Sequence, residues 1–266
     1  MFSECSVMQG KNIIYYHRAY RKLPSVSKYY FIFSFFLLTA LFDFIIFLSY
    51  PKITKIITDI AKYVLSLSIS GDTIEIITKT FLFKNVYMLD LPGKYPSFLF
   101  SLILAEISLV TMLVVPRIKR ITKPTTIWIF IIFFINLVSS LFFIFFPDHF
   151  PYDMLIFSEL YIKTEVSMWL LIPLVMTIAL ISLPSSNITK FILITFTLSY
   201  SILFGCIRYI IFLYLLQKFS YLFMSIMFFI FGPLVDFFYV IGIYSFYVNI
   251  VGKQAKKDWE IWKWSF

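Results

Sequence analysis

Four ionisable side chains lie inside long apolar stretches of the sequence, where a charge is costly and usually has a partner or a function. They are Asp43, Glu106, Arg208 and Asp236. With a helical rise of about 1.5 Å per residue, the first three lie about 10–12 Å from the outer ends of three different stretches. Asp236 lies deeper, and Asn136 on a further stretch lies at a depth similar to that of the first three. The sequence therefore predicts a candidate intramembrane polar cluster formed by these five residues.

The charges of this cluster do not balance. One arginine that faces two or three carboxylates leaves the site negative, so a shared proton or a bound cation would complete it. Two interpretations are open. Either Arg208 pairs with one acid and fixes helix packing, or the cluster lines a functional polar pocket that opens outward.

The composition explains what surrounds these charges. Of the 266 residues, 61% are hydrophobic and 14% are charged, whereas a soluble domain has about 45–50% apolar and about 25% charged residues. Lipid is the natural solvent for such a chain, and a helix needs about 20 residues to cross its hydrocarbon core. Six stretches qualify, namely 29–50, 98–116, 125–147, 166–184, 191–216 and 221–250. We expect an all-α polytopic membrane protein with about six transmembrane helices, the last of them kinked at Gly232-Pro233.

Basic residues at the ends of these stretches predict the orientation of the chain. The segments 1–28, 117–123 and 251–266 are basic, and the connection 148–165 is acidic. The positive-inside rule places the basic segments in the cytoplasm. We therefore expect a multi-pass protein of the plasma membrane with a cytoplasmic N-terminal segment, a six-span domain over 29–250 and a cytoplasmic tail. The net charge of +9 then indicates anionic lipid headgroups rather than nucleic acid.

The connection 51–97 is the longest and has patterns of its own. Apolar residues between Ile53 and Leu65 recur at the helical i, i+3 and i+4 spacing, with lysines on the other face. This pattern predicts an amphipathic helix on the outer membrane surface or against other helices. After Gly71, β-branched and aromatic residues predict a small β-hairpin. We expect both elements outside the membrane, as an insertion in the six-span domain.

The sequence contains no residue pattern that is typical of an enzyme. Cys5 and Cys206 are not expected to meet in a disulfide, and Cys206 has no histidine nearby to activate it. His17 and His149 lie outside the apolar stretches, so they do not form a pair of intramembrane haem ligands. Glycine-rich phosphate loops and zinc motifs are also absent from the sequence. We therefore predict no catalytic residue, no metal ligand and no cofactor, which favours a protein that is not an enzyme.

The layout of one region resembles a known family. After the expected external helix and hairpin, the segment Leu89-Asp-Leu-Pro-Gly-Lys-Tyr-Pro-Ser97 leads back into the membrane. This order resembles that of exosortases and archaeosortases, multi-pass membrane transpeptidases that process C-terminal sorting signals. The family has an A-C-S-G-I-R-S motif at this point, an Asn-x-x-Arg-like segment in a later span, and an external histidine beyond it.

The motifs of that family are only partly present. When Gly93 is placed on the motif glycine, Leu91 stands at the position of the cysteine. Asn136 matches the later asparagine, Ser139 stands where arginine is expected, and His149 follows in the right order. The resemblance covers residues 50–165 and concerns layout rather than motifs. It implies a degenerate, non-catalytic relative.

Together these patterns favour a non-catalytic integral membrane subunit or accessory protein of a cell-envelope assembly, of which a degenerate exosortase-like protein is one form. Its expected partners are the lipid bilayer and other membrane or envelope proteins, and not nucleic acid. The alternative is a small transporter or lipid-processing membrane protein. Such a protein would use an outward-facing polar site at Asp43, Glu106 and Arg208.

Overall fold

The computed structural model describes residues 28–68, 74–118, 120–181, 183 and 186–257. Cys5 and His17 lie outside these residues, as do the segment before Lys28 and the tail after Lys257. Within the described part, six helical stretches are long and apolar enough to cross a membrane. The structure therefore confirms the predicted number of apolar helices.

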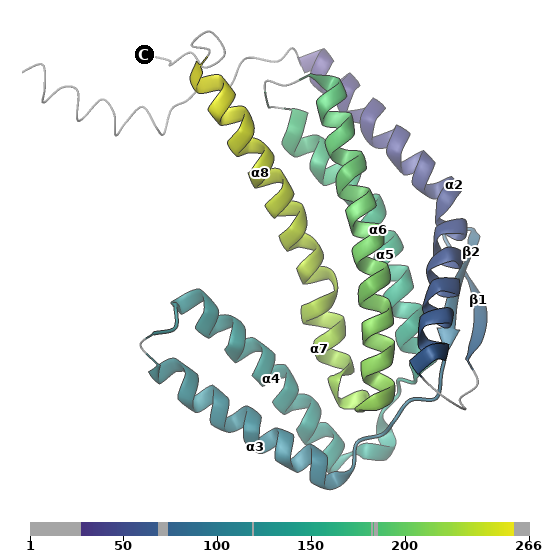
Figure 1. The fold of residues 1–266 in the computed structure, drawn as a ribbon, viewed down its shortest axis with the longest axis vertical. Helices are drawn as coiled ribbons and strands as arrows, with labels where there is room; N and C mark the ends of the chain where they lie inside the picture. Colours follow the sequence, from purple (N-terminus) through teal and green to yellow (C-terminus); the bar gives the residue numbers. More distant parts are fainter. Residues whose placement is uncertain (1–27, 69–73, 119, 182, 184–185, 258–266) are drawn as a thin grey trace, which may run out of the picture. The chain divides into compact units, whose positions relative to one another are not determined.

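Five of the six stretches contain one long helix each, and the sixth is broken, as can be followed in Figure 1. The single helices are α2 (Lys28–Ser68), α3 (Phe98–Val114), α4 (Lys123–Phe145), α5 (Met154–Ile181) and α6 (Asn187–Lys218). The sixth stretch consists of η3 (Tyr221–Phe223), α7 (Met224–Phe229), the π-helical η4 (Ile230–Leu234) and α8 (Val235–Lys257). The 3-10 turns η1 (Val115–Arg117) and η2 (Pro147–His149) follow α3 and α4.

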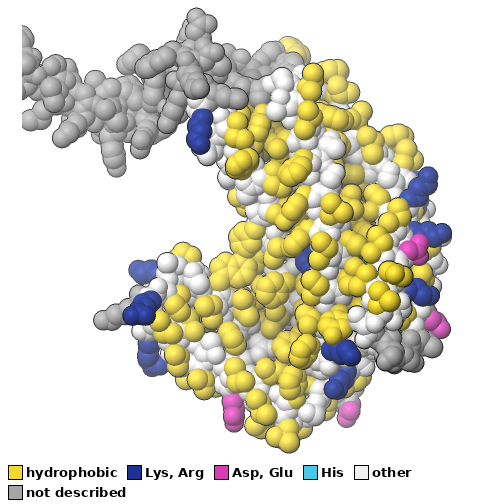
Figure 2. Space-filling model, viewed as in Figure 1, with side chains coloured by type: hydrophobic (Ala, Val, Ile, Leu, Met, Phe, Trp, Pro, Cys, Tyr) yellow, Lys and Arg dark blue, Asp and Glu magenta, His cyan; other side chains and the backbone are white. Residues whose placement is uncertain are grey.

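Hydrophobic side chains cover most of the helix surface visible in Figure 2, and basic side chains gather at the α3–α4 connection. An exposed apolar surface of this extent suits lipid rather than water.

The chain divides into two compact units. The first comprises the described residues of Met1–Phe44, Leu171–Leu198 and Tyr239–Phe266. In it the rings of Phe42 and Phe191 lie 4.9 Å apart and join α2 to α6. The second unit comprises Ile45–Leu170 and Ser199–Phe238. It contains the hairpin, α3, α4 and α7, and it holds most of the polar contacts described below.

α2 is longer than one membrane crossing. Its 41 residues extend about 60 Å, roughly twice the hydrocarbon thickness of about 30 Å. Pro51 lies inside this helix, at the place where the sequence predicted the end of a span and the start of a separate external helix. The structure corrects that division, because the amphipathic segment continues the span as one helix.

A lysine from the hairpin compensates for Pro51 in α2. Proline has no N–H, so the carbonyl of Phe47, four residues earlier, lacks its helical donor. Lys84 Nζ donates a 2.9 Å hydrogen bond to that carbonyl and lies 4.6 Å from the centre of the Phe47 ring. The hairpin is therefore tied to α2 at the position of Pro51.

The second half of α2 has three faces, so the predicted apolar face is divided. The buried face lies against the hairpin, where Thr58 Oγ1 donates to the Tyr87 carbonyl at 3.1 Å, and consists of Thr54, Ile57, Thr58, Ala61 and Leu65. A charged face is exposed and consists of Lys52, Lys55, Asp59 and Lys62. The third face, which we call the α2 stripe, is apolar and exposed and consists of Ile56, Ile60, Tyr63 and Leu67.

The predicted hairpin is confirmed. β1 (Glu75–Phe81) pairs antiparallel with β2 (Lys84–Asp90), and a two-residue turn joins them. The hydroxyl of Tyr209 on α6 accepts a 3.0 Å hydrogen bond from the Leu89 N–H. Lys79 forms an ion pair with Glu159 on α5. These contacts fix the hairpin against α5 and α6.

α3 and α4 pack through small and polar side chains. The buried residues are Ser101, Ala105 and Ser108 on α3 and Asn136, Ser139, Ser140 and Phe143 on α4. Small residues let two helix backbones approach closely where no water is present. Asn136 Nδ2 donates a 2.7 Å hydrogen bond to Ser108 Oγ and so joins the two helices.

Candidate functional site

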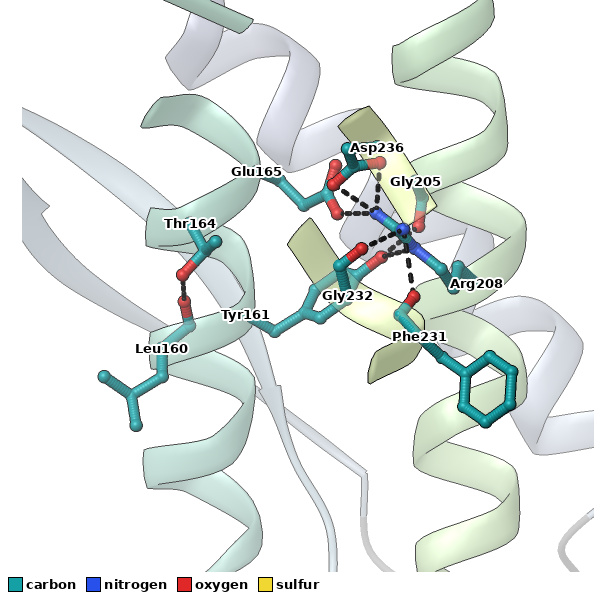
Figure 3. A network of polar contacts seen from close by, with 9 residues as sticks. All are labelled: Leu160, Tyr161, Thr164, Glu165, Gly205, Arg208, Phe231, Gly232 and Asp236. Carbon is teal, nitrogen blue, oxygen red and sulfur yellow. Dashed lines mark hydrogen bonds and ion pairs between the residues drawn. The ribbon is translucent and has the colours of Figure 1, made fainter. Parts of the chain in front are cut away.

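A buried polar network in the second unit surrounds Arg208 of α6 (Figure 3). α5 supplies Tyr161 and Glu165, which are four residues apart and therefore on one face of the helix. The broken sixth helix supplies two backbone carbonyls and the carboxylate of Asp236. Each of these four residues is at most 4% exposed. The network therefore joins three helical elements in the interior of the unit.

The break in the sixth helix makes two of these contacts possible. Gly232 has the non-helical angles φ −87° and ψ −121°, and Pro233 follows it. Arg208 Nη1 donates to the carbonyls of Phe231 at 3.0 Å and Gly232 at 2.9 Å. Asp236 lies in the first turn of α8, where the helix dipole favours negative charge. A cation thus meets the carbonyls before the break, and an anion lies at the helix start after it.

The remaining donors of Arg208 are also engaged. Its Nε donates to Tyr161 Oη at 3.0 Å. Its Nη2 donates to Glu165 Oε1 and, at 3.0 Å, to Asp236 Oδ2. A guanidinium has five N–H donors, and the five acceptors named here match that number. Arg208 is therefore saturated by the protein itself.

Gly205 on α6 lets Glu165 approach the helix. A Cβ atom at Gly205 would lie 2.5 Å from Glu165 Oε2, which is too close for any contact between these atoms. The Gly205 carbonyl also accepts a 2.9 Å hydrogen bond from Tyr161 Oη. Glycine at this position thus serves both residues of α5.

The network carries one arginine and two carboxylates. Glu165 Oε2 is buried and has no hydrogen-bond partner among the described residues. One proton on a carboxyl group would balance the charge, whereas breaking the network would expose an uncompensated buried charge. Chemically, the arrangement is suited to hold three helical elements together and to hold a proton.

The structure brings together only part of the predicted cluster. Arg208 and Asp236 form an ion pair. Asn136 instead joins α4 to α3, and Glu106 is exposed on α3. Asp43 is half-buried in the other compact unit.

Sequence reasoning missed Glu165 and Tyr161. The predicted connection 148–165 placed both outside the membrane-spanning stretches, but α5 already begins at Met154. The predicted connection between the third and fourth spans was therefore too long. Glu165 lies inside α5 and is buried, not exposed to water. The signal was present, since the residues from Met154 to Ile162 are largely apolar and lead into the predicted span.

Other features of the unit lie apart from this network. Two adjoining cavities of about 320 and 140 Å³ share Phe150, Tyr152 and Ser225 in their linings. Among the described residues, no group of three or more His, Cys, Asp or Glu side chains could hold a metal ion.

The segment between the hairpin and α3 packs tightly. A Cβ atom at Gly93 would lie 2.1 Å from Tyr221 Oη, and the Tyr221 N–H donates to the Lys94 carbonyl at 2.9 Å. Leu91 in the same segment is buried. Gly93 is therefore explained by the close approach of Tyr221.

Asp90 ends β2 at the open end of the hairpin, opposite Glu75. Burial raises the pKa of Asp90, and the negative charges of Asp153 and Glu75 raise it further, although the Leu91 N–H acts in the opposite direction. The carboxylate form of Asp90 is therefore disfavoured by the folded structure.

Comparison of the chain with protein families, with curated proteins and with solved structures finds no match.

Proposed function

We propose that this chain is a non-catalytic integral membrane subunit or accessory protein of a cell-envelope assembly. The observation that carries the proposal is the α2 stripe, whose four side chains are between 45% and 71% exposed. The stripe lies on the half of α2 that extends beyond one hydrocarbon thickness from Lys28. An exposed apolar stripe on such a helix is typical of a contact with another protein.

The network at Arg208 supports a structural role for the buried charges. All the donors of Arg208 are used inside the protein, and its side chain is 5% exposed. A site that binds or converts a ligand keeps some of its polar groups available to that ligand. Arg208 keeps none, so we assign it to the packing of α5, α6 and the broken helix.

The orientation in this proposal follows the basic connections. With both termini in the cytoplasm and the chain in the plasma membrane, the α3–α4 connection is cytoplasmic. The second half of α2 and the hairpin then lie on the outer side. There they can contact other envelope proteins.

Purification from native membranes in a mild detergent tests this function. The proposal predicts a second membrane or envelope protein in a fixed ratio to this chain. Ile60→Glu and Leu67→Glu should each reduce that ratio several-fold, because they place a charge in the stripe. Lys62→Glu, on the charged face of the same helix, is the matched control and should leave the ratio unchanged. A wild-type chain that purifies alone as a monomer would refute the proposal.

One observation favours a second candidate, a small carrier or lipid-processing membrane protein. Glu165 Oε2 is buried without a partner beside Arg208, so this carboxyl could exchange a proton during transport. The site would centre on Glu165, Arg208 and Asp236 rather than on Asp43 and Glu106. Proton uptake by vesicles that contain the wild type but not Glu165→Gln would favour the carrier over the subunit.

If the chain is related to exosortases, the proposal treats it as a degenerate relative without their catalytic cysteine. Leu91 is apolar and buried, so this position offers no nucleophile. His149 lies in η2, at the end of α4. The proposal therefore assigns no peptide-transfer activity to this chain.

A further inference from the structure

The turn of the hairpin has an unusual choice of residues. Leu82 and Phe83 both have positive φ angles, of 46° and 71°. Two-residue hairpin turns with two such angles strongly favour Asn-Gly, because side chains larger than those of Asn or Gly strain this backbone. A leucine followed by a phenylalanine is therefore a poor choice for the stability of the turn.

The two side chains are also exposed. Phe83 is 97% exposed and Leu82 is 40% exposed, so neither gains much from packing inside the chain. A strained backbone that presents apolar side chains outward indicates a role in binding rather than in folding.

Hydrogen bonds fix the turn beside α2. Tyr50 Oη donates to the Phe81 carbonyl and, at 3.2 Å, to the Leu82 carbonyl. Phe47 on α2 is likewise held by Lys84, the residue that follows the turn. Phe47 is 19 residues after Lys28, which is about 29 Å along the helix and close to the hydrocarbon thickness of about 30 Å. The turn therefore meets α2 where a span that starts at Lys28 leaves the hydrocarbon.

We propose that Leu82 and Phe83 form a membrane-anchoring tip that inserts into the interfacial layer of the bilayer beside α2. Phenylalanine and leucine gain free energy when they leave water for the lipid interface. The tip would hold the hairpin, and with it the second half of α2, in a fixed position at the membrane surface.

Spin labels on the full chain test this insertion. Cys5 and Cys206 are replaced by serine, and single cysteines are placed at Phe83→Cys or at Asn85→Cys, an exposed position in the same hairpin. The purified protein is reconstituted in vesicles of phosphatidylcholine and phosphatidylglycerol. Accessibility to oxygen, relative to a water-soluble nickel chelate, should be several-fold higher at position 83 than at position 85. Leu82→Cys is the second label site and should resemble position 83.

Two outcomes would overturn the proposal. Equal accessibility at positions 83 and 85 would show that lipid does not cover the tip, and it would leave a protein partner as its occupant. The second outcome comes from a test of the backbone strain in the turn, in which Leu82→Asn is combined with Phe83→Gly. This variant should unfold at a higher temperature than the wild type in detergent, because its residues suit the turn. A lower unfolding temperature would remove the strain from which the proposal starts.

Discussion

Arg208 Nη2 lies 2.9 Å from Asp236 Oδ1, and the same guanidinium donates to the carbonyl of Gly232. One side chain of α6 therefore contacts both sides of the break in the sixth helix. It donates to two carbonyls at the break, and it pairs with the acid in the first turn of α8. Pro51 shows a parallel solution in α2, where Lys84 satisfies the carbonyl of Phe47. In both helices a basic side chain from another element donates to a carbonyl close to a proline.

Removal of Arg208 should be the most damaging single change in this unit. Arg208→Met leaves two buried carboxylates without a counter-charge, which costs about 3–5 kcal/mol for buried pairs in general. The free energy of unfolding in detergent, obtained from denaturant titration, measures the loss. Leu203→Ala on the exposed surface of the same helix is the control and should change it little. An Arg208→Met variant as stable as the control would show that the network contributes nothing to the fold.

Substitution of Gly205 should reveal how closely α5 approaches α6. Gly205→Ala places a Cβ atom 2.5 Å from Glu165 Oε2, and Glu165 must shift while its other carboxylate oxygen accepts from Arg208. Overpacking of this kind costs about 1–3 kcal/mol. Gly242→Ala in α8 is the matched control, since no atom lies within 4 Å of its added Cβ. Equal unfolding free energies for the two alanine variants would contradict the close contact.

The hydrogen bond between Asn136 and Ser108 should contribute much less to the free energy of unfolding than the Arg208 network does. Asn136→Leu removes the hydrogen bond to Ser108, and interhelical hydrogen bonds of this kind contribute about 0.6 kcal/mol on average. We expect a loss of about that size in the unfolding titration. A loss as large as that of Arg208→Met would show that the buried polar face of α4 has a role beyond packing.

The pKa of Asp90 makes the stability of the hairpin depend on pH. Because the folded state raises this pKa, it binds the proton more tightly than the unfolded state does. The folded protein then loses stability as the pH rises above the unfolded value of about 3.9. Asp90→Asn should raise the unfolding temperature at pH 7 and leave it unchanged where Asp90 is protonated in both states. An equal effect at both pH values would indicate lost contacts rather than titration.

Much of the fold could be predicted because it depends on length and periodicity. The number of apolar helices, the hairpin and the break at Gly232-Pro233 all follow from patterns within one segment. The bounds of the helices were predicted less accurately. α5 begins twelve residues before the predicted span at 166–184, since Glu159, Lys163 and Glu165 interrupt the apolar sequence there although the helix continues through them.

The site could be predicted only in part, for a physical reason. Depth along a helix follows from the sequence, but rotation about its axis and the choice of neighbour do not. Arg208 and Asp236 were therefore singled out, whereas the contact of Arg208 with Glu165 was not. The position of the turn at Leu82 and Phe83 could not be predicted either, because two-residue turns favour Asn and Gly rather than large apolar residues.

The most direct test of the proposed function is the native mass of the protein in mild detergent, measured for two forms of the chain. One is the wild type, and the other combines Arg208→Met, Glu165→Leu and Asp236→Leu, which replaces the buried charges with apolar side chains of similar size. If the chain is a subunit and its buried charges are structural, both forms should occur in the same assembly, heavier than the 31.5 kDa chain, with a second protein in fixed ratio. A wild type that has the mass of one chain, with no bound protein, would contradict the account.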